Sequence, residues 1–204
     1  MEETFKSSES IAAHILSALE TGLSVPKGTF NNNITNSHNA SELRLNHYPA
    51  IEIAELRKGS VSRIWPHFDL GVITLLFQDR VSGLEFEDRA APAPSCDCET
   101  HSGPQFRSVQ SNDPSEMIVN VSETLQRWTN GKLPAGLHRV GIPSEMKGVE
   151  DGMLRERFSV PYFVKADRDA NVGSLKEFVE VGEKKLYDDM TAIEYHLSRI
   201  QSAY

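Results

Sequence analysis

Three residues of the types that bind transition metals stand out in the sequence. His67 and Asp69 lie two residues apart at the start of an apolar run, and a second histidine, His138, follows later in the chain. Residues i and i+2 of an extended strand point to the same face, so an imidazole and a carboxylate could reach one metal ion together. Two histidines and one carboxylate on one face of a metal are typical of non-haem Fe(II) sites for oxygen chemistry. His-x-Asp pairs also occur by chance on surface strands. From these residues alone, a solvent-exposed strand that binds no metal is therefore an alternative interpretation.

Length and charge limit the classes of protein to which this chain could belong. Its 204 residues are enough for one domain with a hydrophobic core. The net charge is -8 at pH 7 and no cluster of lysines and arginines is present, which argues against a nucleic-acid surface. No stretch approaches the roughly 18 apolar residues of a transmembrane helix, and residues 1–6 lack a secretory signal pattern. We therefore expect a soluble, cytoplasmic protein without a nucleic-acid or membrane partner.

The two cysteines, Cys96 and Cys98, are separated by one residue. This spacing is too close for an ordinary structural disulfide, and two thiols are too few for a structural zinc site. We predict that both are free thiols in a loop.

The elements that must position the candidate ligands are mostly short strands. The pair Asn130-Gly131 predicts a hairpin turn that places His138 in the partner strand. Many short strands with turn signals indicate a sandwich or a jelly-roll barrel. Alternating apolar residues and turn residues predict strands over residues 43–49, 62–77 (a strand pair or one long bent strand), 84–87, 117–121 and 155–164.

Helices and one long loop are expected around these strands. Apolar residues at 3–4-residue spacing predict helices over residues 8–20 and 175–200, and the apolar stripe of the second is expected to pack against the sheet. Residues 89–114 are rich in proline, glycine and serine, so we predict a long loop there.

Four blocks of residues between about residues 43 and 165 carry a resemblance to a known family. They are Asn46-x-Tyr48-Pro49; His67-Phe68-Asp69-Leu70-Gly71 running into Thr74-Leu75-Leu76-Phe77-Gln78-Asp79 and Gly83-Leu84; Val119-Asn120-Val121 followed by Leu125, Trp128-Thr129-Asn130-Gly131 and His138-Arg139-Val140; and Arg157-Phe158-Ser159 with Pro161-Tyr162-Phe163. Their order and spacing resemble the iron- and 2-oxoglutarate-dependent oxygenases of the isopenicillin N synthase-like family.

This resemblance implies a mainly β fold with flanking helices. Its core would be a double-stranded β-helix, a jelly-roll, cupin-like barrel with iron in its mouth. Three segments follow: an N-terminal helix and polar loop at residues 1–40, the barrel at 41–165 with its long loop at 89–114, and a C-terminal helical segment at 166–204.

The resemblance also implies which residues hold the cofactor and the cosubstrate. Fe(II) would be bound by His67, Asp69 and His138, with 2-oxoglutarate as cosubstrate and dioxygen as oxidant. Asn46 and Tyr48 match positions that reach 2-oxoglutarate near the metal.

Arg157 and Ser159 match the Arg-x-Ser pair that holds the distal carboxylate of 2-oxoglutarate in the family. A guanidinium group grips a carboxylate through two parallel hydrogen bonds, and a hydroxyl two residues further along a strand adds a donor on the same face. In isolation Arg157 would more often form a surface salt bridge. Arg155, two residues before Arg157, would lie on the same face of the strand and is an alternative carboxylate ligand. Ser159 completes the Arg-x-Ser pair with Arg157 and therefore favours Arg157.

Other polar and aromatic residues of the four blocks are expected to support this site. We interpret Gln78 and Asn120 as supporting or structural polar groups, and Trp128 as a core residue rather than a substrate platform. Phe68 and Trp65 lie beside the ligands and are bulky, which suggests an apolar or aromatic substrate.

The chain departs from the family pattern in two places. Ser122 and Glu123 stand where the family usually has Gly-Asp, so Glu123 could keep the acidic function while the glycine turn is changed. Family members also usually carry a further N-terminal region, which supplies part of the substrate pocket, before the first helix expected here.

Three hypotheses of function follow. The first is an oxygenase of specialised (secondary) metabolism that oxidises a C–H bond of a small organic substrate, by hydroxylation, desaturation or ring rearrangement, with release of succinate and CO2. The second is an iron oxidase of the same family without 2-oxoglutarate, in which Arg-x-Ser binds a carboxylate of the substrate; Asn46 and Tyr48 argue against it. The third is a truncated fragment that is inactive or needs a partner, because a barrel lacking strands would expose sheet edges and associate.

Overall fold

The computed structural model describes residues 1–35, 38–91, 103–109, 113 and 115–201. Cys96 and Cys98 lie outside the described residues, so their assignment as free loop thiols stays a prediction. No helix within these ranges is long and apolar enough to cross a membrane.

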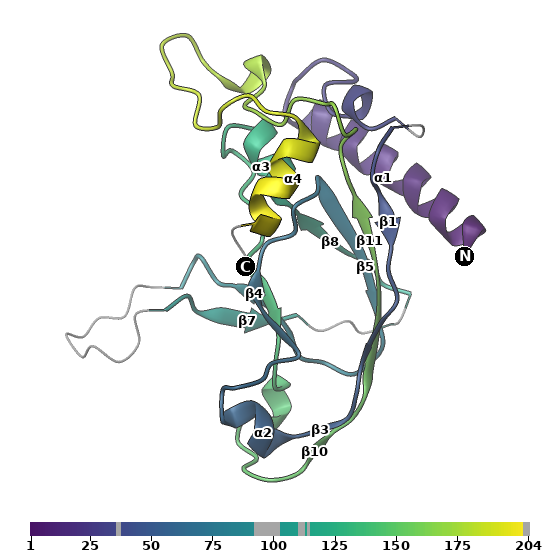
Figure 1. Ribbon diagram of the computed structural model, residues 1–204, viewed down its shortest axis with the longest axis vertical. Helices are drawn as coiled ribbons and strands as arrows, with labels where there is room; N and C mark the ends of the chain where they lie inside the picture. Colours follow the sequence, from purple (N-terminus) through teal and green to yellow (C-terminus); the bar gives the residue numbers. More distant parts are fainter. Residues whose placement is uncertain (36–37, 92–102, 110–112, 114, 202–204) are drawn as a thin grey trace, which may run out of the picture.

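A large antiparallel sheet forms one wall of the barrel (Figure 1). Its strand order is β1-β11-β5-β8, and β2 also pairs with β11. The strand β11 is central because it pairs with β5 on one side and with β1 and β2 on the other. The five strands of this main sheet are β1 (Glu42–Leu43), β2 (Asn46–Tyr48), β5 (Ile73–Gln78), β8 (Ile118–Val121) and β11 (Arg157–Val164).

A four-stranded antiparallel sheet forms the second wall. Its order is β4-β9-β6-β7, so strands far apart in the sequence become neighbours. The pairing of β4 with β9 places His67 opposite His138. Its strands are β4 (Ile64–His67), β6 (Leu84–Glu87), β7 (Phe106–Ser108) and β9 (His138–Val140). Two antiparallel sheets with flanking helices confirm the predicted jelly-roll class.

The two faces of the main sheet have different environments. Ile73 and Leu75 of β5 belong to the hydrophobic core, whereas the intervening Thr74 faces the space between the sheets. Along β11, Tyr162 likewise belongs to the core, and its neighbours on both sides face the cavity. This alternation follows from the period of two along a strand, and it keeps the polar chemistry on one face of the sheet.

The helix α1 (Glu2–Gly22) covers the core face of the main sheet. Ala12 and Leu16 are buried on its inner side and form one apolar cluster with Phe30, Trp128, Phe178 and the core residues of β5 and β11. The rings of Phe30 and Trp128 stack at 6.0 Å. Both predictions that fall here, a helix over residues 8–20 and a core position for Trp128, are confirmed.

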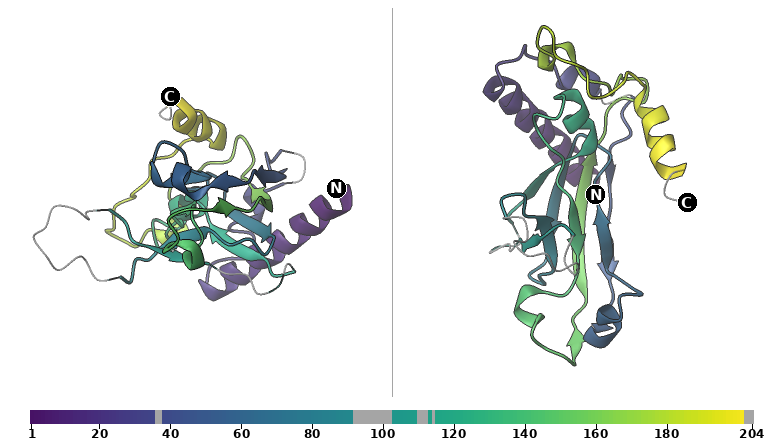
Figure 2. Two further views of the ribbon diagram at one scale, coloured as in Figure 1. Left: turned by 90° about the horizontal axis from the view of Figure 1, so that it is seen from below. Right: turned by 90° about the vertical axis from the view of Figure 1, so that its left-hand side faces the viewer.

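Short elements close the two ends of the barrel. At the lower end in Figure 1, β3 (Ile51–Glu52) pairs with β10 (Met153–Leu154) beside the helix α2 (Ile53–Arg57). The helices α3 and α4 lie toward the opposite end, as Figure 1 and the right-hand view of Figure 2 show. These remaining helices are α3 (Glu123–Trp128), α4 (Ala192–Gln201), η1 (Asn31–Asn33), η2 (Ser144–Met146) and η3 (Lys176–Phe178).

The predicted hairpin at Asn130-Gly131 is wrong. Both residues have positive φ angles, 51° and 82°, but they end the helix α3 rather than join two strands. The amide of Gly131 donates to the carbonyl of Gln126, as in the left-handed turns that end helices. Two consecutive left-handed residues fit both a hairpin turn and a helix end, so the dipeptide alone could not distinguish the two. The strand that contains His138 pairs instead with β4 and β6.

Two other element boundaries differ from the predictions, and one open alternative is decided. The predicted helix over residues 175–200 is reduced to η3 and α4, because Gly182 adopts a φ of 89° between them and Leu186 is exposed. The predicted loop at 89–114 contains the strand β7, which pairs with β6. The stretch 62–77 is a pair of strands, β4 and β5, in different sheets, so the predicted strand pair is confirmed and the single bent strand is wrong.

Candidate active site

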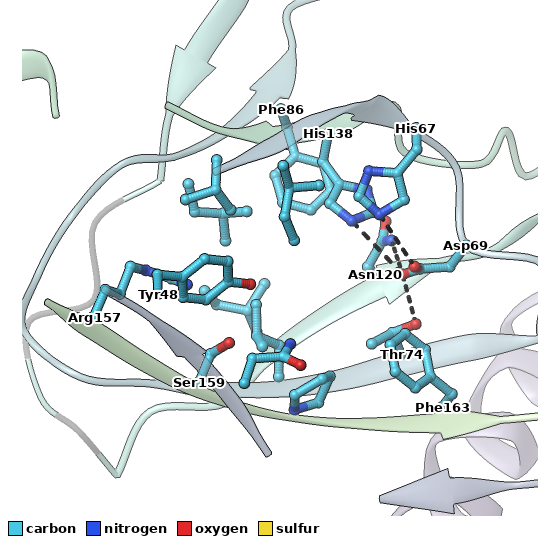
Figure 3. Close-up of a pocket in the computed structure, with 17 residues that line it drawn as sticks. Tyr48, His67, Asp69, Thr74, Phe86, Asn120, His138, Arg157, Ser159 and Phe163 are labelled. Carbon is cyan, nitrogen blue, oxygen red and sulfur yellow. Dashed lines mark hydrogen bonds and ion pairs between the residues drawn. The ribbon is translucent and has the colours of Figure 1, made fainter. Parts of the chain in front are cut away.

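A cavity of about 60 Å³ lies between the two sheets, and side chains from both line it. Figure 3 shows two groups of polar side chains in it: two histidines and a carboxylate at one end, and an arginine, a serine and a tyrosine at the other. The structure thus brings together in one cavity all seven residues that the sequence singled out: Asn46, Tyr48, His67, Asp69, His138, Arg157 and Ser159.

His67, Asp69 and His138 form a cluster that could hold a metal ion, since one ligand atom from each lies within 4.8 Å of the others. The Nε2 atom of His67 is 3.8 Å from Oδ1 of Asp69, and the Nε2 atom of His138 is 3.9 Å from Oδ2. The side chain of His67 is 39% exposed, whereas those of Asp69 and His138 are 8% and 12% exposed. The cluster is therefore held by the barrel and reached from the side of His67.

Backbone carbonyls orient both imidazole rings. Nδ1 of His67 lies 2.9 Å from the carbonyl oxygen of Trp65, and Nδ1 of His138 lies 3.0 Å from that of Gly136. A carbonyl oxygen accepts only, so each Nδ1 carries a hydrogen, and in a neutral ring Nε2 is the atom with a lone pair toward the cluster. This is the arrangement in which a histidine is ready to bind a metal.

The carboxylate of Asp69 is fixed by neighbours on two strands. Its Oδ2 atom accepts hydrogen bonds from Oγ1 of Thr74 at 2.7 Å and from Nδ2 of Asn120 at 3.1 Å. Its own backbone carbonyl accepts from the amide of Glu123 at the start of α3 at 2.8 Å. The sequence assigned a supporting role to Asn120 but missed Thr74, although Thr74 alternates with the core residues of β5 and so had to face the cavity.

Burial keeps His138 in its neutral form. The ring of Phe86 stacks on the imidazole with centroids 5.2 Å apart. Burial lowers the pKa of His138 below its ordinary value of 6.5, although the nearby Asp69 raises it in part. A neutral imidazole binds a metal ion, so burial prepares this residue for that role.

Arg157 is a buried cation whose hydrogen-bonding capacity is not filled. Its side chain donates from Nη2 to Oε1 of Gln78 at 2.6 Å, and its guanidinium lies over the ring of Tyr48 at 5.0 Å. Nε and Nη1 are buried and find no partner among the described residues. Burial lowers the pKa of Arg157, which shows that the environment disfavours the bare charge. A buried guanidinium with unpartnered donors is suited to bind an anion such as a carboxylate.

Strand pairing brings the neighbours of Arg157 to the same spot. Tyr48 of β2 lies directly opposite Arg157, and Asn46 lies opposite Ser159. On its other side, Ser159 lies opposite Gln78 of β5. Residues directly opposite in an antiparallel pair share a face, so these groups surround one end of the cavity.

The aromatic residues beside the proposed metal ligands do not line the cavity. Trp65 and Phe68 are not among the cavity-lining residues; Trp65 is exposed, and the aromatic lining comes from Phe86 and Phe163. Arg155 is exposed, which agrees with the choice of Arg157.

The Ser122-Glu123 departure has a structural role. Ser122 is the residue before the first turn of α3, and its amide donates to the carbonyl of Val72. The Glu123 carboxylate accepts hydrogen bonds from the hydroxyl of Tyr195 at 2.8 Å and from Arg199 at 3.2 Å. The acidic side chain therefore ties α3 to α4 rather than facing the cavity.

Known proteins resemble the chain along its whole length. The curated 2-oxoglutarate-dependent dioxygenase ucsF of Acremonium sp is 50% identical over 208 residues, and the 2-oxoglutarate-dependent dioxygenase phqC of Penicillium fellutanum is 45% identical over 204 residues. Both alignments cover 100% of this chain but only 60% and 54% of the relatives. The chain thus spans little more than half the length of these proteins.

A solved structure has the same fold. The crystal structure of a full-length Neurospora crassa protein in complex with alpha-KG matches with a TM-score of 0.80 at 23% identity. The match covers all of this chain and 56% of the other, and at this identity it supports the fold alone.

Family membership follows from the sequence comparison. A family model described as the 2OG-Fe(II) oxygenase superfamily matches residues 39–166, which include both sheets and every cavity residue discussed above. The donor set agrees with the cofactors of that family, because two imidazoles and a carboxylate suit Fe(II) and a buried guanidinium suits the carboxylate of 2-oxoglutarate. The chain belongs to the 2OG-Fe(II) oxygenase superfamily.

Proposed function

We propose that this chain forms the catalytic core of a 2-oxoglutarate-dependent oxygenase that oxidises a C–H bond of a small organic substrate and releases succinate and CO2. One observation carries the proposal: a three-residue metal cluster and a buried, under-partnered arginine line the same cavity. Names of relatives that are 45–50% identical support the dependence on 2-oxoglutarate.

His67, Asp69 and His138 would hold Fe(II). Bound Fe(II), with dioxygen and 2-oxoglutarate, supplies the oxidising chemistry. The chain itself provides geometry: carbonyls hold the two imidazoles with Nε2 inward, and hydrogen bonds hold the carboxylate between them. Because these three residues would bind the metal from one side, the other coordination positions would be available to the cosubstrate and dioxygen.

Arg157 would bind the distal carboxylate of 2-oxoglutarate, since its guanidinium is buried and keeps donors, Nε and Nη1, without a partner among the described residues. Gln78 holds the third nitrogen and so fixes the orientation of the guanidinium plane. Ser159 adds a hydroxyl from the next position on the same face, and Asn46 and Tyr48 close the site from β2. The apolar part of the lining, which includes Phe86 and Phe163, would exclude water from the bound cosubstrate.

Turnover of 2-oxoglutarate without a primary substrate tests this proposal. Purified chain with Fe(II), dioxygen and 2-oxoglutarate should form succinate, and Arg157→Gln and His138→Ala should not. Arg155→Gln, which removes an exposed arginine two residues away, is the matched control and should behave as the wild type. Oxygen consumption that does not depend on 2-oxoglutarate would favour the second hypothesis, an iron oxidase that binds a substrate carboxylate at Arg157.

The third hypothesis, a chain that needs a partner, remains a prediction. The strand β8 pairs only with β5 within the described sheets, and Val119 on it is 44% exposed. An uncovered strand edge favours association with another chain. Sedimentation of the purified chain tests this: a stable monomer contradicts the hypothesis, and a dimer or a heterogeneous aggregate supports it. The cytoplasmic location likewise stays a prediction.

A further inference from the structure

A second cavity, of about 70 Å³, is lined by residues of α4 and of the segment that follows Asp69. Its walls carry three basic side chains, Lys165, Arg168 and His196, and no aspartate or glutamate. This composition contrasts with the net charge of -8 of the whole chain at pH 7. The second cavity shares no lining residue with the cavity between the two sheets, so it is a separate site.

The basic groups of the second cavity are poorly balanced by acidic ones. Among the described residues, the side chains of Arg168 and His196 form no hydrogen bond or ion pair. Nζ of Lys165 lies 3.5 Å from Oε1 of Glu42, and the same carboxylate is also bound by Arg44. Burial and the charge of Lys165 lower the pKa of His196, although Glu42 raises it in part. The cavity therefore presents positive charge that a bound anion would balance.

The rest of the wall is apolar and held in place. Leu70, Ala166, Ala192 and Ile193 contribute aliphatic side chains. The carbonyl of Leu70 accepts from Oγ1 of Thr124 at 2.8 Å, and the Thr124 amide donates to the next carbonyl along the chain at 2.9 Å. A short aliphatic chain would therefore find a contact surface that needs little further ordering when it binds.

We propose that the second cavity binds a short aliphatic carboxylate, with the carboxylate group toward Lys165 and Arg168 and the aliphatic chain against Leu70 and Ala192. A single water takes up roughly 10–15 Å³ of such a cavity, so the volume fits a ligand of only a few non-hydrogen atoms. The bound anion would contact the residue directly after the proposed metal ligand Asp69 without entering the cavity between the two sheets. This inference goes beyond the proposed function and does not rest on it.

Methyl NMR spectra of the chain with labelled alanine, titrated with butyrate, test this site. Butyrate should shift the methyl signals of Ala40, Ala166 and Ala192, which line the second cavity, with the millimolar affinity expected of so small a ligand. Acetate, which lacks two methylene groups, should bind about tenfold more weakly. 1-Butanol, which keeps the chain without the charge, should also bind more weakly.

Variants separate the parts of the proposed site. Lys165→Met and Arg168→Gln should each weaken butyrate binding by about threefold to tenfold, since each removes one charge from a partly solvated ion pair. Lys27→Met, which removes an exposed lysine elsewhere, is the matched control and should equal the wild type. Ala192→Leu fills the second cavity and should abolish the shifts, whereas Arg157→Gln should leave them unchanged.

Four outcomes would overturn the site. They are the absence of alanine methyl shifts with butyrate, equal binding of butyrate and 1-butanol, wild-type affinity in both Lys165→Met and Arg168→Gln, and shifts that disappear in Arg157→Gln. The last outcome would place butyrate in the cavity between the two sheets instead. Arg168→Gln changes an exposed side chain, so it provides the comparison should Lys165→Met or Ala192→Leu not fold.

Discussion

At the scale of residues, the site depends on contacts that leave ligand atoms free. Both histidines use Nδ1 for a backbone carbonyl, and Asp69 uses Oδ2 for Thr74 and Asn120. Each contact removes a rotational freedom of the ligand before a metal arrives. Preorganisation of this kind strengthens metal binding, because less conformational entropy is lost when the ion binds.

Replacing Thr74 by valine should weaken Fe(II) binding. The substitution keeps the β-branched shape of the side chain and removes the hydroxyl that donates to Asp69 at 2.7 Å. Loss of a group that orients a metal ligand typically costs about tenfold to a hundredfold in affinity. Anaerobic titration with Fe(II) measures the effect, and Thr21→Val, which removes an exposed hydroxyl on α1, is the control. Equal affinities of wild type and Thr74→Val would show that Asp69 is held without Thr74.

Gly136 should not tolerate a side chain. A Cβ atom there would collide with Oδ1 of Asn120 and lie 2.8 Å from Cε1 of Phe86, and the Gly136 carbonyl holds His138. Gly136→Ala must therefore displace neighbours of two of the three proposed ligands, and we expect weaker Fe(II) binding together with a lower free energy of unfolding. Gly141→Ala is the control, because a Cβ atom at that position meets nothing within 4 Å. An unchanged Fe(II) affinity in Gly136→Ala would contradict the tight fit.

At the scale of elements, helix ends and strand pairing carry the site. The first amides of α3 donate to the loop between β4 and β5, so the position of Asp69 depends on that helix. The helix is in turn fixed by α4: Tyr195 donates to Glu123, and the guanidinium of Arg127 lies 4.5 Å above the Tyr195 ring. The C-terminal helix therefore supports the metal cluster through α3, although it contributes no residue to the cavity between the two sheets.

Tyr195→Phe should lower the free energy of unfolding by about 1 kcal/mol, the usual net contribution of one hydrogen bond. Burial and the Glu123 hydrogen bond raise the pKa of Tyr195 above its ordinary value of 10.0. A raised folded-state pKa means that this contribution is fully present below about pH 10 and is lost as the pH rises through the folded-state value. Urea unfolding at about pH 7 and about pH 9, both below that window, should give the same difference between the two proteins. A difference that disappears at the higher pH would contradict this account.

At the scale of the whole molecule, sequence reasoning succeeded where a side chain had to face the cavity. The Arg157–Ser159 pair follows from alternation on β11. His67, Asp69 and His138 follow from the family motifs instead, because β4 ends at His67 and Asp69 lies in the loop after it. The folded chain places all five residues in one cavity. Phe86 and Phe163 were missed as cavity-lining residues. Which aromatic side chains meet in the cavity depends on how strands far apart in the sequence pair and pack in the two sheets.

Helix ends and turns were less predictable than the cavity. Asn130-Gly131 satisfies both a hairpin and a helix end, so only the position of the flanking chain decides between them. The apolar residues of 175–200 fit a helical stripe, yet Phe178 packs in the core while Leu186 and Leu197 are exposed. Tertiary packing therefore overrides a periodicity that the local sequence presents.

The most direct test of the central claim, that one cavity binds both Fe(II) and 2-oxoglutarate, is absorption spectroscopy without oxygen. Fe(II) chelated by a 2-oxo acid gives a visible charge-transfer band, and the titration should be run on the wild type, His138→Ala, Arg157→Gln and the control Arg155→Gln. We predict a band in the wild type and in the control, no band in His138→Ala, and in Arg157→Gln a band only at much higher 2-oxoglutarate concentration. A folded wild-type chain without a band, or a band that is indifferent to both His138 and Arg157, would contradict the assignment.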